Sequence, residues 1–294
     1  PDMIGKPMRL FSRSIASFAL SLLILLPAHL FAAEDGTKAD QRWRFYVGGF
    51  SPTVDSQITI NGDIGTPPPL IPEDVLGMED GKTVAWGGVD WNSAKRHSLE
   101  LEYFQLDRDG ARGFVDENIE IGDYIVESGA IASTSSMKLG RLTYGFHLME
   151  RERSEIQINA GLHIADFSVA FQMLGNVCDI SVGEAPPCPL ISSPVAESES
   201  VTAPLPHIGG SYMYNFTNDL AFRFQAIGFA IELDSIEGSI LELDADLEWQ
   251  PWDHVGLGLA VRYFKINFDS NGGDLNGELD YEYVGPALYV SASF

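Results

Sequence analysis

Four acidic residues alternate with apolar ones along the segment LELDADLEW, residues 241–249. Glu242, Asp244, Asp246 and Glu248 take every second position, and Leu, Ala and Trp fill the positions between them. Carboxylates in such a row can attract cations or neutralise buried arginines, and an extended chain points alternate side chains to opposite faces. The segment therefore requires a structure with one apolar face and one face that holds charge.

Other side chains capable of catalysis or metal binding are poorly spaced for either. His163 and Asp166 are three residues apart, so on a strand they point to opposite faces and make a poor catalytic pair. The segment at 268–280 has the composition of a calcium loop but lacks its Asp-x-Asp-x-Asp-Gly spacing and distal Glu. The sequence contains no G-x-S-x-G, H-E-x-x-H or phosphate-binding loop. We therefore predict no catalytic residue, cofactor or metal site.

Two cysteines, Cys178 and Cys188, bracket a proline-containing segment. In an exported protein such a pair is expected to form a disulfide, because export places the thiols in an oxidising compartment.

Composition excludes one class of partner. The 294 residues include 18 Lys plus Arg and 42 Asp plus Glu, which gives a formal net charge of -24. Nucleic-acid binding depends on a basic surface, so no nucleic-acid partner is predicted.

The N-terminal region has the features of a secretory signal peptide. Arg9 and Arg13 precede an apolar core at 19–26, and small residues follow at Ala32 and Ala33. The apolar core is shorter than the roughly 20 residues of a spanning helix. We predict that residues 1–33 comprise a removed signal peptide with upstream residues, and that 34–294 form the mature, exported protein.

Alternation of apolar and polar residues recurs along most of the mature chain. It is clear in the segments 42–50, 97–104, 140–149, 155–164, 219–226 and 254–264. The pattern is typical of half-buried strands, and it fits both a soluble sandwich and an outer-membrane barrel.

Connection lengths and aromatic placement favour the barrel. Short connections are predicted at 92–97, 149–154, 215–219 and 250–254, and long loops, expected to be extracellular, at 55–81, 107–131, 174–200 and 269–277. Aromatic residues near the short turns include Trp43, Trp91, Tyr144, Trp249 and Trp252, and a second set toward the other strand ends includes Tyr103, Phe104, Phe167, Tyr263 and Phe264. Two such girdles fit the two membrane interfaces.

The C-terminal segment PALYVSASF alternates and ends in Phe294, which resembles the assembly signal of outer-membrane proteins. With the signal peptide and turn pattern, the chain resembles small single-chain bacterial outer-membrane β-barrel proteins of OmpA/OmpW-like architecture. Residues 249–268 and 281–294 also resemble a family of uncharacterised bacterial barrels, which implies no known activity. The resemblance implies a Gram-negative outer-membrane location, contact with lipid and lipopolysaccharide, and delivery by periplasmic chaperones and the assembly machinery. It also favours a monomer.

The predicted fold is all-β: an antiparallel transmembrane barrel of about ten strands. The strands begin near residues 42, 82, 97, 134, 155, 203, 219, 238, 254 and 279. Eight strands is the alternative, if the first or fifth pair is loop structure. Residues 113–126 also alternate, so we expect them to prolong strands beyond the membrane.

In a barrel, charged residues on the strands must point inward, because lipid disfavours them outside. The predicted lumen network comprises Glu242, Asp244, Asp246, Glu248, Arg223, Arg262, Arg44, Arg141, Glu100 and Glu102. Turn positions place Asp246 opposite Arg223, and Glu242 near Arg262. A narrow barrel can be filled by such side chains, which favours a structural or loop-presenting protein. A narrow cation-preferring channel or small-solute porin is the alternative, and a surface protease or lipid hydrolase is the third hypothesis.

Overall fold

The structure is a computed structural model that describes residues 41–60, 70–93, 96–115, 118–233, 236–271 and 276–294. The chain divides into two compact units, Pro1–Asp40 and Gln41–Phe294, and all described residues belong to the second. The predicted signal peptide at 1–33 therefore lies outside the described residues.

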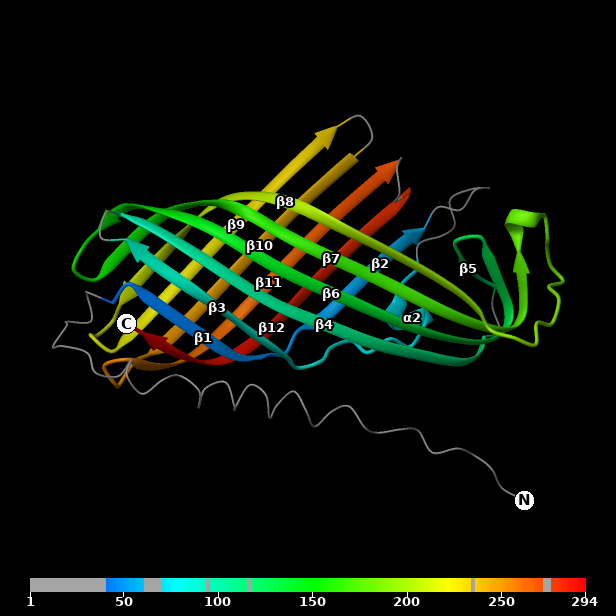
Figure 1. Ribbon diagram of the computed structural model, residues 1–294, viewed down its shortest axis with the longest axis horizontal. Helices are drawn as coiled ribbons and strands as arrows, with labels where there is room; N and C mark the ends of the chain where they lie inside the picture. The colour runs from blue at the N-terminus through cyan, green and yellow to red at the C-terminus, as the bar shows by residue number, and fades with distance from the viewer. Residues whose placement is uncertain (1–40, 61–69, 94–95, 116–117, 234–235, 272–275) are drawn as a thin grey trace, which may run out of the picture. The chain divides into compact units, whose positions relative to one another are not determined.

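Ten strands of the second unit form a closed antiparallel ring (Figure 1). In ring order they are β1 (Trp43–Phe50), β3 (Val84–Ser93), β4 (His97–Val115), β6 (Tyr124–Glu150), β7 (Ser154–Asp179), β8 (Val195–Asn215), β9 (Leu220–Leu233), β10 (Ile236–Trp249), β11 (Val255–Asn271) and β12 (Asn276–Ser293). Pairing of β1 with β12 closes the ring. The predicted ten-stranded barrel is confirmed, and the eight-stranded alternative is wrong.

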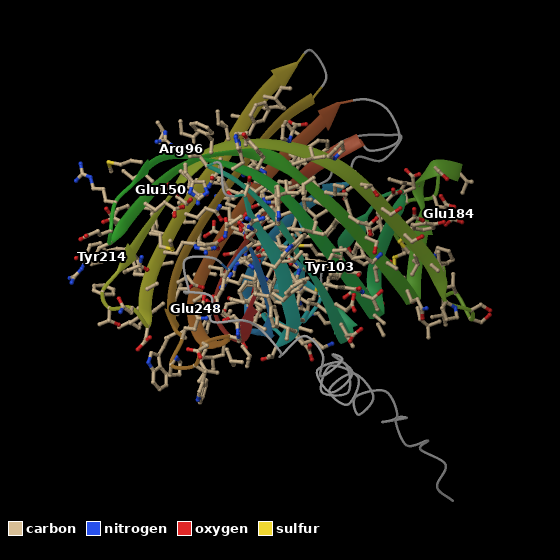
Figure 2. All side chains as sticks on the ribbon, turned by 60° about the vertical axis from the view of Figure 1, so that its left-hand side comes forward. Arg96, Tyr103, Glu150, Glu184, Tyr214 and Glu248 are labelled. Carbon is tan, nitrogen blue, oxygen red and sulfur yellow. A yellow bond between two sulfur atoms is a disulfide. The ribbon has the colours of Figure 1, made fainter. Side chains whose placement is uncertain are left out.

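The strands β3–β4, β6–β7, β8–β9 and β10–β11 are joined by short connections at one end of the ring, which we call the short-turn end. The opposite end is the long-strand end, because several strands continue well beyond the others there (Figure 1). β6 and β7 have 27 and 26 residues, whereas β9 and β10 have 14 each. Figure 2 places Glu150 and Tyr214 at the short-turn end and Glu184 at the long-strand end.

Two of the predicted long loops consist largely of strand. The segment at 107–131 contains the end of β4, the short strand β5 (Ile119–Ile121) and the start of β6, and the segment at 174–200 contains the end of β7, the 3-10 helix η3 (Ile180–Val182) and the start of β8. The alternating pattern continues through these residues, so their backbone groups pair rather than form loops. The extension predicted for residues 113–126 is the sequence feature that indicated this.

The third predicted loop, 55–81, also contains regular structure. β2 (Thr53–Ile60) continues β1 beyond Ser51 and Pro52 and pairs with β12 in the same register. The chain then returns, with α2 (Pro72–Val75), so that Leu70 pairs with Ile58 and Met78 with Gly110 of β4. This returning segment occupies the gap in the wall between β2 and β4. Of the fourth predicted loop, 269–277, residues 272–275 lie outside the described residues.

An apolar band covers the outward face of the ring. On β10 it runs over residues 241–249, close to the roughly 9–11 residues that a tilted strand needs to cross a bilayer. Exposed ion pairs end the band toward the long-strand end, at Lys138–Asp166 (3.0 Å) and Lys265–Glu282 (3.4 Å). Outward side chains beyond this boundary are mainly Ser, Thr, Asp and Glu.

Exposed aromatic residues gather at the short-turn end, and Tyr103, predicted for the other girdle, is exposed at the opposite border of the band, at 51%. Trp43, Trp91, Tyr144, Trp249 and Trp252 are exposed at the short-turn end, as predicted. The prediction of a second girdle is wrong for Phe104, Phe167 and Phe264, whose side chains are 1%, 9% and 0% exposed. These three occupy inward positions of their strands, and the rings fill the lumen instead of meeting lipid.

The wall has a seam between β8 and β9. β8 pairs with β7 from Val195 to Tyr214 but with β9 only from Ile208 onward. Pro206 and Pro204 lie two and four residues before Ile208, and their ring nitrogens take the positions whose N–H groups would face β9. Because proline has no N–H, it cannot extend this ladder, and the sequence itself ends the pairing.

Among the described residues, no helix is long and apolar enough to cross a membrane.

Candidate functional site

The ten residues predicted for the lumen occupy inward positions of six of the ten strands. β1 contributes Arg44, β4 contributes Glu100 and Glu102, β6 contributes Arg141, β9 contributes Arg223, β11 contributes Arg262, and β10 contributes the row of four acids. Alternation on each strand directs these side chains to one side, and closure of the ring brings strands that are distant in sequence face to face.

Arg141 spans the lumen and joins two strands on opposite sides. Its Nη1 donates to Glu242 Oε1 at 2.6 Å and to Asp244 Oδ2 at 3.1 Å, on β10. Its Nη2 donates to Glu100 Oε1 at 2.6 Å and to Glu102 Oε2 at 3.3 Å, on β4. One buried guanidinium therefore neutralises carboxylates that would otherwise repel one another.

Arg262 makes a second crossing. Its Nη2 donates to Glu102 Oε1 at 2.5 Å and to Glu242 Oε1 at 2.8 Å, and its Nε donates to Asp244 Oδ1 at 3.0 Å. The guanidinium carbon also lies 4.8 Å from the centre of the Trp86 ring. The predicted neighbour of Arg262 was Glu242; the observed register places Asp244 directly opposite, and Arg262 contacts both.

A third group of contacts lies closer to the short-turn end. Arg44 Nη1 donates to Asp90 Oδ2 at 2.6 Å, and Arg44 Nη2 donates to Glu248 Oε2 at 2.7 Å. Asp90 stands opposite Arg44 in the pairing of β1 with β3, whereas Glu248 reaches it from across the barrel. Figure 2 shows Glu248 in the lower part of the ring.

The predicted pairing of Asp246 with Arg223 is confirmed in register, since the two residues are direct partners on β10 and β9. Their side chains have additional partners. The Tyr289 hydroxyl lies 2.8 and 2.9 Å from the two carboxylate oxygens of Asp246, and Arg223 lies 3.7 Å from Asp90.

Two histidines continue the network toward β6 and β8. His163 Nε2 lies 2.8 Å from Glu242 Oε2, and His163 Nδ1 lies 3.0 Å from Nδ1 of His207. His207 Nε2 in turn lies 3.1 Å from the Thr143 hydroxyl. Asp166, by contrast, is on the outward face with Lys138. His163 and Asp166, the best candidates for a catalytic pair in the sequence, therefore point to opposite faces of the strand, as predicted.

An aromatic layer lies against the network on the side of the long-strand end. Phe50, Phe104, Phe264 and Tyr283 contact one another with ring centres 5.0 to 5.7 Å apart. A small cavity of about 40 Å³ lies among the charged residues, with room for a few water molecules. Charges and rings together occupy the barrel interior at this level.

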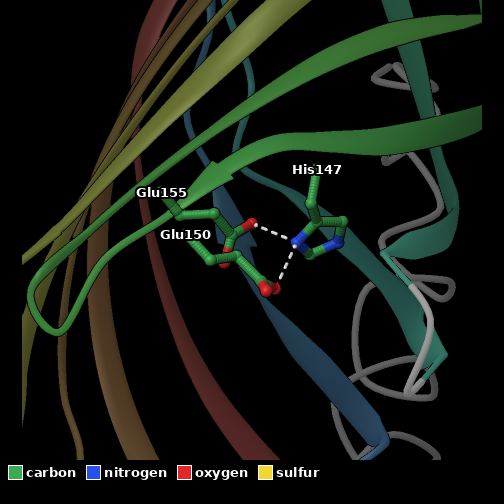
Figure 3. Close-up of side chains that lie close together, drawn as sticks. All are labelled: His147, Glu150 and Glu155. Carbon is green, nitrogen blue, oxygen red and sulfur yellow. Dashed lines mark ion pairs between the residues drawn. The ribbon is translucent and has the colours of Figure 1, made fainter.

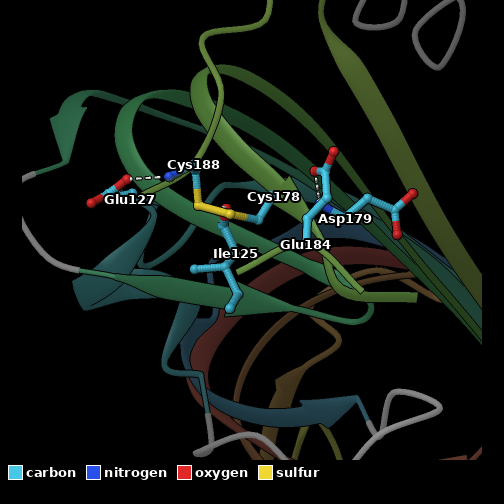
Figure 4. Close-up of a disulfide and its surroundings, with 6 residues drawn as sticks. All are labelled: Ile125, Glu127, Cys178, Asp179, Glu184 and Cys188. Atoms are coloured by element: carbon cyan, nitrogen blue, oxygen red, sulfur yellow. Dashed lines mark hydrogen bonds between the residues drawn. A yellow bond between two sulfur atoms is a disulfide. The ribbon is translucent and has the colours of Figure 1, made fainter. Parts of the chain in front are cut away.

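Cys178 and Cys188 form a disulfide at the long-strand end, with a Cα–Cα distance of 4.9 Å (Figure 4). The backbone N–H of Cys188 donates to Glu127 Oε2 at 2.7 Å, which ties the bridge to β6. Asp179 and Glu184 also bond at the start of the same connection, where the Asp179 N–H donates to Glu184 Oε2 at 2.9 Å.

Phe294 takes part in closing the ring. Its backbone N–H donates to the Trp43 carbonyl at 2.8 Å, and its carbonyl accepts from the Trp43 N–H at 2.9 Å. The Phe294 ring stacks on His254 at 5.5 Å. The residue that resembles an assembly signal thus forms the last pairing between the final strand and the first.

No family model and no curated protein sequence matches this chain. Solved structures do match. The outer membrane protease OmpT from Escherichia coli has a TM-score of 0.53 at 7% identity, and the match covers 87% of this chain and 97% of OmpT. The outer membrane protein OprG from Pseudomonas aeruginosa has a TM-score of 0.37 at 11% identity, and the match covers 88% of this chain and 99% of OprG. Ail, the attachment invasion locus protein of Yersinia pestis, has a TM-score of 0.31 at 8% identity, and the match covers 85% of this chain and 98% of Ail.

The likeness to OmpT supports the fold, and the outward face supports the location. Pairing of the first strand with the last closes the ring, and the outward band is apolar with a tryptophan girdle at one border. The chain is therefore a small outer-membrane β-barrel protein with ten strands and a polar interior.

Proposed function

We propose that this barrel is a surface-presenting anchor rather than an open conduit. The observation that carries the proposal is the filled interior, in which Arg141 and Arg262 join carboxylates from opposite walls beside a layer of aromatic rings. Short turns face the periplasm in barrels of this class and longer connections face outward. On that orientation, the extended parts of β4, β6, β7 and β8 project from the cell.

The projecting strands present a polar outward face. Asp107, Ser136, Ser168 and Ser200 lie in one row across the four strands, and the Ser136 hydroxyl donates to Asp107 Oδ1 at 2.6 Å. A groove of about 430 Å³ crosses this row. The proposed role of the barrel is to hold this serine-rich, acidic sheet above the lipid surface.

A narrow cation channel is the second candidate, and an excess of inward acids favours it. The network described above comprises seven carboxylates, from Asp90, Glu100, Glu102 and the four acids of β10, against four guanidiniums, from Arg44, Arg141, Arg223 and Arg262. Acidic linings favour cations over anions.

Planar-bilayer recording separates the two candidates. We expect silent bilayers from folded, inserted protein, with insertion checked by protease protection of the barrel. Stepwise cation-selective currents that disappear on combining Glu242→Ala with Asp244→Ala would contradict the anchor and support the channel.

A surface enzyme is the third hypothesis, and the neighbour OmpT is a protease by name. The described part of the chain offers this hypothesis little support. Its histidines are His97, His147, His163, His207 and His254, and their contacts lie in the lumen or at the short-turn end. None of them lies on the projecting sheet, where a surface hydrolase would need its base.

A further inference from the structure

A β-bulge at the short-turn end gathers three potential metal ligands. His147 pairs with Gln157 and Met149 pairs with Ile156, so Leu148 is an extra residue on β6. An extra residue reverses the alternation that follows it. Glu150, which would otherwise point away from His147, therefore points to the same side.

The partner strand supplies the third ligand. Glu150 stands opposite Glu155 at the start of β7, and both carboxylates approach the His147 ring (Figure 3). His147 Nδ1 lies 3.2 Å from Glu150 Oε1 and 3.0 Å from Glu155 Oε1. One ligand atom from each of the three residues lies within 4.8 Å of the other two.

The imidazole is buried and directed into this cluster. His147 is only 6% exposed, and its Nδ1 has no hydrogen-bond partner in spite of the two nearby carboxylates. Two carboxylates repel each other and a neutral Nδ1 lone pair, so a cation between the three groups would remove the repulsion. The unpartnered nitrogen is the observation that separates this cluster from an ordinary group of surface acids.

We propose that His147, Glu150 and Glu155 bind a divalent cation of the Zn²⁺ type. One imidazole nitrogen and two carboxylate oxygens suit a borderline metal, and three protein ligands leave a fourth position for water. The Gln157 side-chain amide lies 3.4 Å from His147 Nε2 and also bonds Glu155. Gln157 therefore contacts both the imidazole ring and one of the two carboxylates, which helps to hold them in place around the cluster.

The metal would join the adjacent ends of the two longest strands at the short-turn end. Binding of a ligand to the folded state alone raises its stability, so Zn²⁺ should also raise the temperature at which the barrel unfolds.

The test is Zn²⁺ titration of the untagged, full-length barrel in detergent after chelation, followed by calorimetry and by the visible spectrum of the Co²⁺ form. We expect one site per barrel, at least tenfold weaker binding for Glu150→Gln and His147→Gln, and unchanged binding for Glu152→Gln in the same turn. Glu150 is largely exposed, so its substitution leaves folding intact, which migration of unheated protein on SDS gels verifies.

Two outcomes would overturn the proposal. The first is wild-type binding no tighter than that of Glu150→Gln, which would mean that a proton on His147, rather than a metal, neutralises the carboxylates. The second is an equal loss of binding in Glu152→Gln, which would indicate attraction by the general negative charge of the turn.

Discussion

Individual lumen residues depend on partners from distant strands. Arg262 is 2% exposed and contacts Glu102, Glu242 and Asp244. Arg262→Met removes one of the two guanidiniums that contact these three carboxylates, and Arg141 alone then has to offset their mutual repulsion in a confined space. We expect a loss of about 3–5 kcal/mol in unfolding free energy, measured by urea titration in detergent micelles.

The matched control is Lys265→Met, on the same strand but the opposite face. Lys265 is 41% exposed and pairs with Glu282 at the border of the apolar band. Exposed pairs contribute about 0–1 kcal/mol, so this variant should unfold like the wild type. Similar losses in the two variants would contradict the assignment of Arg262 to a buried network.

Glu197 predicts a pH dependence in the projecting sheet. Burial, and then the negative charges of Glu199, Asp123 and Asp179, raise the pKa of Glu197 above its usual value. The folded sheet therefore binds protons more readily than the unfolded chain, so its stability rises as the pH falls from neutral through the raised pKa. Amide exchange in residues 195–201, corrected for the intrinsic rate, should be slower at low pH in the wild type. Glu197→Gln should reduce this pH dependence, and an unchanged profile would show that another group is responsible.

At the scale of the elements, the seam between β8 and β9 is encoded by two prolines. Pro206→Val restores an N–H that faces β9, next to the last pair, Ile208 with Gly228. We expect pairing to extend to Ala230, with slower exchange of the Ala230 amide and a gain of about 0.5–1.5 kcal/mol in stability.

Leu205→Val is the control for this substitution. The N–H of Leu205 faces β7 in the continuous pairing of those strands, so no new bond to β9 can form. If Ala230 exchanges at the wild-type rate in Pro206→Val, the seam is held open by the surrounding sheet rather than by the missing donor.

The strand elements were the most predictable part of the structure. Alternation located nearly all of them, because each half-buried strand carries its own period-two pattern. The bulge at Leu148 was not predicted. One extra residue interrupts the alternation of apolar and polar residues, and the end of a strand interrupts it in the same way. The returning segment with α2 was also missed, because its buried Glu73–Arg108 ion pair joins residues that are distant in sequence.

For the whole molecule, the central assignment is that lipid contacts the outward face. Leu259 is 49% exposed near the middle of the apolar band on β11. Leu259→Arg places a charge in the hydrocarbon and should reduce stability by about 2–4 kcal/mol in lipid vesicles.

Asn267→Arg is the control for this substitution. Asn267 is on the same face of β11 but lies beyond Lys265, outside the apolar band, so an arginine there should have little effect on stability. Unfolding in lipid vesicles, followed by tryptophan fluorescence, measures both variants. Equal tolerance of the two arginines would place the band outside the membrane.

The sequence by itself determined the class of the molecule. Alternating faces, short turns and the C-terminal strand specify a barrel, because these are local patterns that follow from the geometry of an extended chain. It also identified which charges point inward, since lipid excludes them from the other face. Only the tertiary structure decided which of these charges meet, as Arg141 and Glu242 come from strands that lie across the ring. Contacts of that kind depend on register, tilt and closure, and these are properties of all ten strands together.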